Sequence, residues 1–385
     1  MKKVCVVTGT RAEYGLLKPL IKRINDDNEV ELQLVVTGMH LSPEFGLTYH
    51  EIEEDGFCIT EKNEMLLSSD TPNGITKSIG LAIIGFADIF TRIRPDMIVL
   101  LGDRYEIFAA AAAALIHRIQ IAHVGGGELT EGAIDDAMRH SITKMSTLHF
   151  TSTEEYRNRV IQLGEQPQNV YCVGSLGVEN IKKQKLLSKE ELGKSIKFNL
   201  DRPYVVVTYH PVTLEADSAE TQIKNLLNAI DRFKEYRIIF TKANADTEGR
   251  IINQLIEQYV SKSSDRAIAV TSLGMTRYLS ALKYCEMVIG NSSSGLIEAP
   301  SFKIPTVNIG YRQKGRVRSE SVIDCGYDEN QIIGAIEKAR CMRKSEKIKR
   351  IVNPYEGIDT SGKMYQAIKE FLEKGKNNKT FYDMT

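Results

Sequence analysis

The chain has 385 residues, and its 50 basic side chains balance its 50 acidic ones, so the formal net charge is zero. That balance excludes an electrostatic argument for nucleic acid or an anionic membrane as a partner, and we expect neither. The chain is longer than one typical domain of about 100–200 residues, so we expect two domains. No uninterrupted apolar run reaches the ~18 residues that are needed to span a bilayer.

Six cysteines are scattered along the chain without a C-x-x-C pair or a cluster. Two of them, Cys5 and Cys172, fall inside predicted core strands. This usage is typical of reduced thiols in a cytoplasmic protein rather than of a disulfide framework or a zinc site. The seven histidines show no paired helical spacing with carboxylates, so we expect no metal.

Strands and helices are predicted to alternate through the first half of the chain. The opening is basic and apolar like a signal peptide, but Gly9, Arg11 and Glu13 interrupt the apolar run, which favours a first core strand at 4–8. Further strands are expected at 31–37, near Cys58, and at 97–101, 120–124, 148–151 and 170–173, with helices at 14–24, 42–55, 74–92 and 154–163. Such alternation predicts a parallel sheet with right-handed crossovers.

The same alternation restarts after a polar, helical crossing segment at 174–203. Strands are predicted at 205–208, 237–241, 267–271, 287–289 and 306–309, and helices at 331–347 and 360–374. The tail from Asn377 is expected to be frayed. Two α/β halves of this kind place a cleft between them, which is a common site for a small ligand.

The loop that follows the first strand, residues 8–15, also opens a helix. Its backbone N–H groups are therefore able to face an anion, and Arg11 adds a positive charge. The loop is neither G-x-G-x-x-G nor a P-loop, so neither NAD nor Mg-ATP is indicated. An ordinary strand-to-helix turn explains the loop equally well.

Carboxylates follow two successive strands in the first half. Gly102-Asp103-Arg104 comes after the strand at 97–101, and Glu128, Asp135 and Asp136 come after the strand at 120–124. Ligands of open parallel sheets bind beyond the carboxyl ends of the strands. Neighbouring carboxyls push their pKa values apart, so that one acts as base and another as acid, as proton transfer at a sugar carbon requires. A structural ion pair is the alternative for Asp103 beside Arg104.

The second half carries a histidine and a glycine–serine turn. His210 ends the strand at 205–208, in the same relative position as Arg11, although a lone histidine is more often structural. The segment 290–300, Gly-Asn-Ser-Ser-Ser-Gly-Leu-Ile-Glu-Ala-Pro, offers N–H and O–H donors at a strand-to-helix turn, which suits a pyrophosphate. Glu298, one turn inside the expected helix, has two oxygens for two ribose hydroxyls. An ordinary capped helix start is the alternative.

A basic loop follows, with Arg312, Lys314, Arg316 and Arg318 in alternate positions. It is either a solvated face or a partner for a diphosphate.

In this order and spacing the motifs resemble the hydrolysing UDP-N-acetylglucosamine 2-epimerases, which supply N-acetylmannosamine and related sugars for sialic-acid-type nonulosonates. The resemblance covers nearly the whole chain and is carried by residues 10–14, 102–104, 126–128, 134–136 with 139–140, 210–213, 290–293 and 312–313. It implies a GT-B-type α/β fold with two Rossmann-like domains whose parallel sheets face across a cleft. The domains are then 1–175, with the acid–base residues, and 176–358, which binds the nucleotide, while the helix and tail at 359–385 pack back on the first domain.

The resemblance also implies a mechanism. A base removes the C2 proton while UDP leaves C1, which gives a 2-acetamidoglucal, and water then adds with inversion at C2 to release the free 2-epimeric sugar. The departing diphosphate needs electrostatic stabilisation. Carried over by position, the catalytic residues are Asp103, Glu128, Asp135 and His210. The substrate-binding residues are Ser292 and Ser293 for the diphosphate, Glu298 for the ribose, Arg11 and Arg312 for the remaining negative charge, and Arg104. No metal or organic cofactor is implied, and the protein is expected to be a cytoplasmic homo-oligomer.

One departure from the family concerns Gly125. Several members carry a catalytic glutamate in a stretch like H-x-E-G-G-E, where this chain has His-Val-Gly-Gly-Gly-Glu at 123–128. One extra residue also separates Glu128 from Asp135. Either Glu128 or Asp136 takes over the missing role, or the substrate differs. Relatives in the legionaminic acid route act on 2,4-diacetamido-2,4,6-trideoxy sugars, some of them linked to GDP, and a C4 acetamido group would use the space that Gly125 leaves.

Three other functions are compatible with these motifs. A GT-B glycosyltransferase would use the same nucleotide pocket but would not need several carboxylates in the first domain. A non-hydrolysing 2-epimerase would return a nucleotide-linked product. A nucleotide-sugar sensor would bind without turnover, and only Gly125 favours it.

Overall fold

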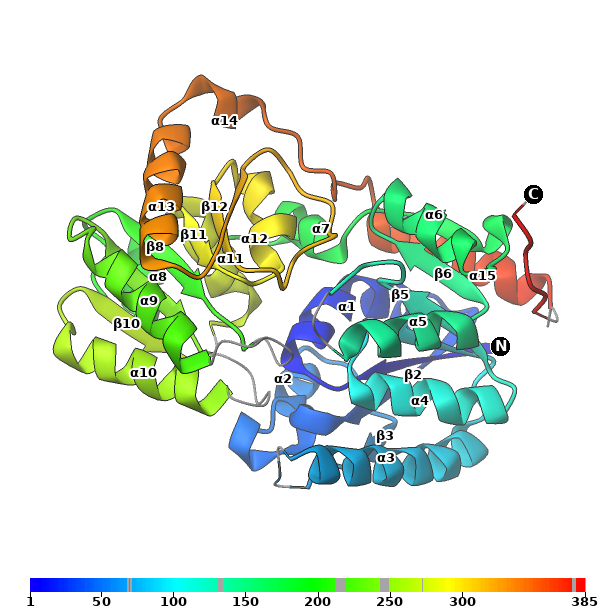
Figure 1. The fold of residues 1–385 in the computed structure, drawn as a ribbon. Coiled ribbons are helices and arrows are strands. Elements are labelled where there is room, and N and C mark those ends of the chain that lie inside the picture. Colours follow the sequence, from blue (N-terminus) through cyan, green and yellow to red (C-terminus); the bar gives the residue numbers. More distant parts are fainter. Residues whose placement is uncertain are drawn as a thin grey trace. The chain divides into compact units, whose positions relative to one another are not determined.

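The structure is a computed structural model that describes residues 1–67, 69, 71–130, 134–211, 219–242, 249–271, 273–375 and 379–384. The chain forms two compact units (Figure 1): unit 1 comprises Met1–Glu128, Ile134–Asn180 and Tyr355–Thr385, and unit 2 comprises Leu129–Ala133 and Ile181–Pro354. Each unit is built on one parallel sheet, which confirms the predicted α/β class. Val212 and Thr213, which belong to the motif at 210–213, lie outside the described residues.

Unit 1 has a seven-stranded sheet in the order β3-β2-β1-β4-β5-β6-β7. Its strands are β1 (Lys2–Thr8), β2 (Val30–Thr37), β3 (Glu61–Asn63), β4 (Met97–Leu101), β5 (Gln120–Val124), β6 (Leu148–Thr151) and β7 (Val170–Cys172). Its helices are α1 (Arg11–Asn25), α2 (Tyr49–Glu54), α3 (Pro72–Ile93), α4 (Tyr105–Ile116), α5 (Asp135–Met145), α6 (Glu154–Gln162) and α15 (Thr360–Glu373), and α7 (Leu176–Lys183) leads into unit 2.

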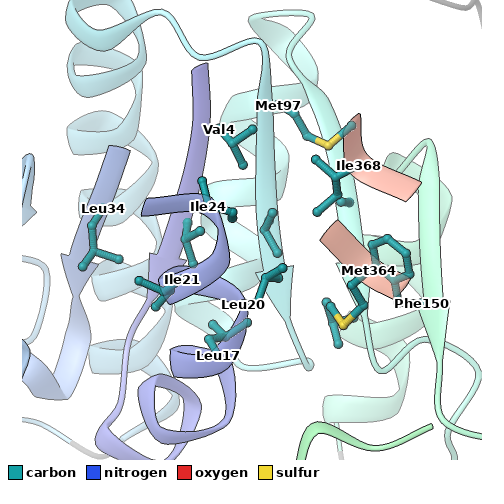
Figure 2. Packing of buried hydrophobic residues seen from close by; sticks show 14 of the residues in the cluster. Val4, Leu17, Leu20, Ile21, Ile24, Leu34, Met97, Phe150, Met364 and Ile368 are labelled. Carbon is teal, nitrogen blue, oxygen red and sulfur yellow. The ribbon is translucent and has the colours of Figure 1, made fainter. Parts of the chain in front are cut away.

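Both faces of this sheet are covered. Along β1, Val4 and Val6 pack on the face that α1 and α15 cover, while Cys5 and Val7 pack on the face that α3 and α4 cover. Successive residues of a strand point to opposite faces, so a strand buried on both sides is apolar throughout, as the β-branched run at 4–8 is. Figure 2 shows Val4 and Met97 of the sheet beside α1 and α15.

Helix α3 has 22 residues and, by length and composition alone, is apolar enough to cross a membrane, with a mean hydropathy of 1.4. Its buried side chains include Phe86, Ile89, Phe90 and Ile93, which belong to the core of unit 1 together with residues of α4 and β4. This amphipathic packing is that of a core helix.

Helix α15, which lies near the end of the sequence, contributes to the core of unit 1. Met364 and Ile368 are fully buried in one cluster with Leu20, Ile21 and Phe150 (Figure 2). We expect Ile368→Ala to lower the free energy of unfolding by about 2–5 kcal/mol, because it removes buried methyl groups and leaves a cavity. Urea denaturation measures the change. The exposed Ile358, mutated to alanine in the same way, is the control, and an equal effect of both changes would contradict the buried position of Ile368.

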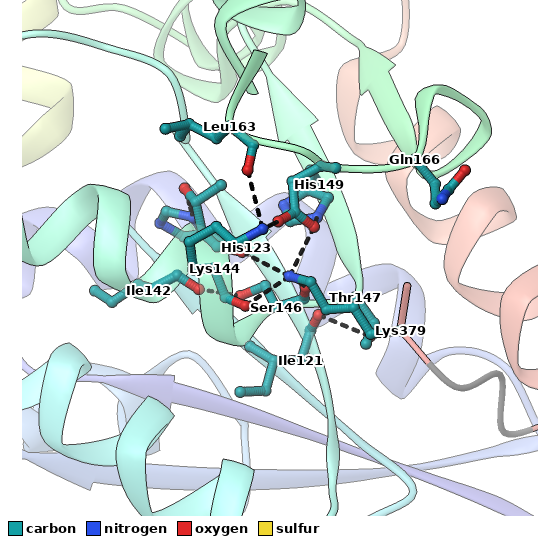
Figure 3. A network of polar contacts seen from close by, with 12 residues as sticks. Ile121, His123, Ile142, Lys144, Ser146, Thr147, His149, Leu163, Gln166 and Lys379 are labelled. Carbon is teal, nitrogen blue, oxygen red and sulfur yellow. Dashed lines mark hydrogen bonds and ion pairs between the residues drawn. The ribbon is translucent and has the colours of Figure 1, made fainter. Parts of the chain in front are cut away.

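The end of the chain is attached to unit 1 by an ionic network (Figure 3). The Lys379 ammonium donates to the carbonyl oxygens of Lys144 at 2.6 Å and Ser146 at 2.5 Å, where α5 ends, and pairs with Glu165 at 2.7 Å. Tyr382 N–H donates to the Gly164 carbonyl at 2.9 Å. The prediction of a frayed tail is therefore wrong for residues 379–384, because the cationic side chain of Lys379 compensates the exposed carbonyls of a helix end.

Unit 2 has a six-stranded sheet in the order β10-β9-β8-β11-β12-β13. Its strands are β8 (Tyr204–Thr208), β9 (Arg237–Thr241), β10 (Ala267–Val270), β11 (Val288–Gly290), β12 (Thr306–Ile309) and β13 (Val322–Cys325). Its helices are α8 (Lys189–Ile196), α9 (Ala219–Asp231), α10 (Gly249–Lys262), α11 (Gly274–Tyr284), α12 (Ser294–Ile297), α13 (Glu329–Arg343) and α14 (Glu346–Arg350).

Two local predictions were wrong, and one strand was missed. The segment 42–55, expected to be one helix, contains a 3₁₀ turn at Pro43–Phe45 and then α2, because Gly46, with φ of +85°, ends the first turn. The helix expected at 331–347 ends at Arg343, and α14 begins after Ser345. Strand β13 was not predicted, since it lies at the edge of the sheet and its four residues are only partly buried.

Candidate active site

The order of strands reverses direction once in each sheet. In unit 1 the reversal lies between β1 and β4, and in unit 2 it lies between β8 and β11. Doubly wound sheets bind ligands at such a switch point, beyond the carboxyl ends of the two strands. The loops there are Gly9-Thr10 and Gly102-Asp103-Arg104 in unit 1, and Tyr209-His210 and Asn291-Ser292-Ser293 in unit 2. Most of the sequence-predicted site residues lie in or next to these loops.

Arg139 contacts several of the acidic site residues of unit 1. Its side chain is only 3% exposed and forms ion pairs with Asp103 and, at 3.1 Å, with Asp136. It also donates to the backbone carbonyl of Glu128 at 2.8 Å. The loops after β4 and β5 and the first turn of α5 are thus tied to one guanidinium. Arg139 was predicted only as part of a motif, although its spacing of three residues from Asp136 on a helix was a usable signal.

Glu128 and the two aspartates of α5 occupy the loop and helix that follow β5. The Ser152 hydroxyl is 3.4 Å from Glu128 Oε1 and orients that carboxyl. Asp135 and Asp136 lie in the first turn of α5, where the helix dipole stabilises negative charge. The ring of His140, one turn further on, is 3.6 Å from Asp136, and burial lowers the pKa of His140. Ser152 and His140 were not predicted to have roles in the site.

Gly125 takes a conformation that disfavours other residues. Its φ is +89°, and its N–H donates to the Phe150 carbonyl at 2.9 Å. A Cβ there would approach Gly102 N no closer than 3.9 Å, so backbone conformation rather than lack of space favours glycine.

His123 supports the loop that follows β4 and carries Asp103. Its ring is fully buried, with Nε2 at 2.8 Å from the Gly102 carbonyl and Nδ1 at 3.1 Å from the Thr143 hydroxyl. Burial lowers the pKa of His123 to about 3, so the ring is neutral and joins the residue before Asp103 to α5.

The two arginines predicted to bind substrate in unit 1 have carboxylate partners. Arg11 pairs with Glu51 of α2 at 2.8 Å, and Arg104 pairs with Glu106 at 2.7 Å. Thr10 caps α1 by accepting from Glu13 N–H. The first loop is therefore a well-capped helix start that also presents Arg11.

The switch point of unit 2 is built on Asn291. Its side chain is fully buried and forms two hydrogen bonds with the backbone of His210. It accepts from the His210 N–H at 2.7 Å and donates to the His210 carbonyl at 2.7 Å. Its own carbonyl accepts from Arg312 at 3.1 Å and Gln313 at 2.8 Å. Residues from three separate segments of the chain thus meet in one place. Asn291 and Gln313 were quoted only within motifs, because their pairing depends on the sheet.

Gly290 and the serines shape the turn after β11. Gly290 has φ of +136°, and a Cβ on it would lie 1.9 Å from the Thr208 carbonyl oxygen, so only glycine fits. Ser292 and Ser293 precede α12, and the Tyr278 hydroxyl donates to Ser294 at 2.7 Å. Glu298 is not one turn inside a helix as expected, because α12 has four residues and ends there, and Pro300 follows in a 3₁₀ turn.

The basic loop is only partly solvated. Arg316 donates to the Leu129 carbonyl at 2.8 Å and to the Thr130 hydroxyl at 3.0 Å, and Arg318 pairs with Asp324. Among the residues that the structure describes, no group of three or more His, Cys, Asp or Glu side chains has a metal-binding arrangement.

Comparisons with known proteins agree with this geometry. The sequence model of the UDP-N-acetylglucosamine 2-epimerase family matches residues 22–369. The chain is 47% identical over 337 residues to the GDP/UDP-N,N'-diacetylbacillosamine 2-epimerase (hydrolyzing) of Campylobacter jejuni, covering 88% of this chain and 87% of the relative. It is 42% identical to polysialic acid biosynthesis protein P7 of Escherichia coli, over 100% of this chain and 98% of the relative.

Solved structures support the fold. The S. aureus MnaA–UDP co-structure has a TM-score of 0.80 and 18% sequence identity, with 100% of each chain covered. The two parallel-sheet units and this neighbour agree with the expected GT-B-type architecture. From the family match and the two sequence relatives it follows that the chain belongs to the UDP-N-acetylglucosamine 2-epimerase family and is a hydrolysing nucleotide-sugar 2-epimerase.

Proposed function

We propose that the enzyme removes the C2 proton of a nucleotide-linked 2-acetamido sugar, eliminates the nucleoside diphosphate from C1 and adds water to release the 2-epimer. The supporting observation is the assembly of Asp103, Asp136 and the Glu128 backbone around the buried Arg139. Elimination and addition need a base on one step and an acid on the other, and grouped carboxyls supply both.

We assign the individual roles from the family resemblance. Asp103 and Asp135 are the acid–base pair, and Glu128 or Asp136 acts where relatives have the glutamate that Gly125 replaces. In unit 2, His210, fixed by Asn291, stabilises the leaving diphosphate. Ser292 and Ser293 bind that diphosphate, Glu298 binds the ribose, and Arg11, Arg104 and Arg312 balance the remaining negative charge.

The sugar that we propose is a 2,4-diacetamido-2,4,6-trideoxy hexose linked to UDP or GDP. The relative that is 47% identical is named for N,N'-diacetylbacillosamine, a sugar of that class. A Cβ on Gly125 would make only ordinary contacts, the nearest at 3.9 Å with Gly102 N, and we expect an acetamido group at C4 to use that place. UDP-N-acetylglucosamine is the second candidate, because the relative that is 42% identical is named for polysialic acid biosynthesis.

A proton NMR time course in deuterated water tests both sugars. Each nucleotide sugar is offered alone, without an acceptor. We expect the diacetamido substrate to give free nucleoside diphosphate and a manno-configured sugar with deuterium at C2. Release from UDP-N-acetylglucosamine alone would assign the second sugar. A nucleotide-linked product would indicate a non-hydrolysing enzyme, and absence of turnover with UDP or GDP substrates would favour a glycosyltransferase or a sensor.

We expect Glu298→Ala to raise the KM for the nucleotide sugar at least about tenfold, the scale of losing a hydrogen bond to a charged group, with a smaller change in kcat. Steady-state kinetics measure the two constants. The control is Glu320→Ala, since that side chain is 72% exposed. An unchanged KM would contradict the assignment of Glu298 to the ribose.

Two further properties are proposed. All six cysteines lie among the described residues and none forms a disulfide, which supports a cytoplasmic location. A homo-oligomer is proposed from the family resemblance, and light scattering during gel filtration tests it.

A further inference from the structure

Two buried carboxyl groups flank the switch point of unit 1 and have no role in the scheme above. Glu13 lies in the first turn of α1, after β1, and is 7% exposed. Glu106 lies in the first turn of α4, after β4, and is 1% exposed. They therefore stand on the two sides of the place where the order of strands reverses.

Both carboxyls pack against Gly9. The Gly9 N–H donates to Glu13 Oε2 at 2.7 Å, and a Cβ on Gly9 would lie 2.6 Å from Glu106 Cγ and 2.7 Å from Glu106 Oε1. The second oxygen of each group, Glu13 Oε1 and Glu106 Oε2, is buried without a hydrogen-bond partner among the described residues. Glu106 Oε1 accepts from Arg104 Nε at 2.7 Å.

One negative charge, not two, is the stable state of this pair. Burial and then the charge of Glu106 raise the pKa of Glu13 to about 8, against the opposing effects of Arg104 and of the Gly9 and Thr10 backbone. Glu13 is therefore mainly protonated at neutral pH, and Glu106 is the charged partner of Arg104.

Other charged groups near the pair are already engaged. Arg11 of α1 is paired with Glu51, and Asp103 is paired with Arg139. His40, whose backbone N–H donates to the Gly9 carbonyl, is buried, and this lowers its pKa to about 4. It is neutral in the range where Glu13 titrates.

We propose that Glu106, with Glu13 packed against the same glycine, is a positioning residue for Arg104 and holds its guanidinium at the carboxyl end of β4 to receive an anionic group of the substrate. The inference rests on the proposed role of Arg104 as a substrate-binding residue. With one proton on the pair, the three side chains are neutral together. When Glu13 ionises, the group carries a net negative charge and repels the nucleotide sugar.

A capping role alone does not explain the arrangement. Thr10 and Glu13 have the spacing of a capping box, which accounts for one oxygen of Glu13. It does not account for Glu106, which is buried against the same glycine and bonded to Arg104. Glu13→Gln still offers an oxygen that accepts from Gly9 N–H, but it cannot titrate. The variant therefore removes the proton and leaves the capping hydrogen bond in place.

The test is the pH dependence of kcat/KM between pH 6 and 9.5 for the wild type, Glu13→Gln and the exposed control Glu44→Gln. We expect the wild type and the control to lose kcat/KM through a rise in KM near pH 8, where Glu13 ionises. Glu13→Gln should lack this rise. A rise at the same pH in Glu13→Gln would overturn the role of the Glu13 proton.

A second set of variants tests the positioning of Arg104. We expect Glu106→Gln to raise KM at least about tenfold at pH 7 with a smaller change in kcat, and Glu106→Asp to restore part of the loss. An unchanged KM in Glu106→Gln, while Arg104→Met raises it, would overturn the positioning role alone. An unchanged KM in Arg104→Met would instead remove Arg104 from the substrate site.

Thermal unfolding supplies a readout that does not depend on activity. A carboxyl whose pKa is raised by folding favours the folded state at low pH, and this contribution is lost as pH rises towards the folded pKa. The wild type should therefore lose stability relative to Glu13→Gln between pH 4.5 and about 8. Parallel curves for the two proteins would overturn the proton held by Glu13 even if no substrate had been found.

Discussion

Replacing Asp103 by asparagine is expected to lower turnover at least about a hundredfold, the scale of losing one acid–base group, while UDP still binds. Asparagine has nearly the same shape and still offers an oxygen to Arg139, but it cannot take up a proton. Asp103 is also supported on two sides, since Arg139 holds its carboxylate and His123 holds the preceding carbonyl. The loss should therefore appear in kcat.

The measurement combines steady-state kinetics with deuterium incorporation at C2 and UDP binding by calorimetry. Asp88→Asn, an exposed change on α3, is the control and should have full activity. Near-normal turnover by Asp103→Asn would exclude Asp103 as the base. Loss of UDP binding together with turnover would show that Asp103 is a structural partner of Arg139.

Glu165→Gln is expected to lower the free energy of unfolding by about 1–3 kcal/mol, the scale of removing one buried hydrogen-bonding partner, because Lys144 and Lys379 are partly exposed to solvent. Glu165 is 3% exposed and contacts Lys144 at 2.7 Å, Lys379 at 2.7 Å and His149 at 3.0 Å. Two ammonium groups would then face each other at the end of α5 without a carboxylate between them. The tail at 379–384 should detach first, because Lys379 joins it to unit 1.

Urea denaturation and hydrogen exchange at the tail measure this effect. Glu154→Gln is the matched control, since that carboxylate is 70% exposed and its pair with Arg157 is long, at 3.9 Å. A change of the same size in both variants would contradict a special role for the buried network.

The same network predicts an acid dependence. Burial alone would raise the pKa of Glu165, but hydrogen bonds from His149, Lys144 and Lys379 outweigh it and lower that pKa to about 2. A carboxyl with a lowered pKa stabilises the fold above its unfolded value and loses this contribution as pH falls towards the folded value. The wild type should lose stability between pH 4.5 and about 2, and Glu165→Gln should lack that component.

Strands buried on both faces were the most predictable part of this protein. The apolar runs at β1, β4 and β8 are typical of strands buried on both faces, and the polar loops that follow them mark the carboxyl edges of both sheets. Edge strand β13 was missed because a short, partly exposed strand lacks that pattern. The tail was misjudged because its attachment depends on carbonyls of α5, more than 230 residues earlier in the chain.

The candidate site was likewise predictable only in part. Asp103, His210 and the serines at 292–293 were found because each follows a strand. The groups that hold them were not, since Arg139 acts on Asp103 and Asn291 acts on His210 only after the sheets form. The proximity of Glu13 and Glu106 could not be predicted from the sequence for the same reason, because their common neighbour is the backbone of Gly9.

The place of α15 in the core of unit 1 has a consequence for synthesis on the ribosome. Residues 181–354 must be translated between the strands of unit 1 and the helix that completes their core. At about 5–20 residues per second this takes roughly 10–35 s, during which the surface of α1 and β6 that receives Met364 and Ile368 has no cover. The nascent chain is therefore most prone to aggregate late in translation, and a stop codon just before α15 should give an insoluble product although every strand has been made.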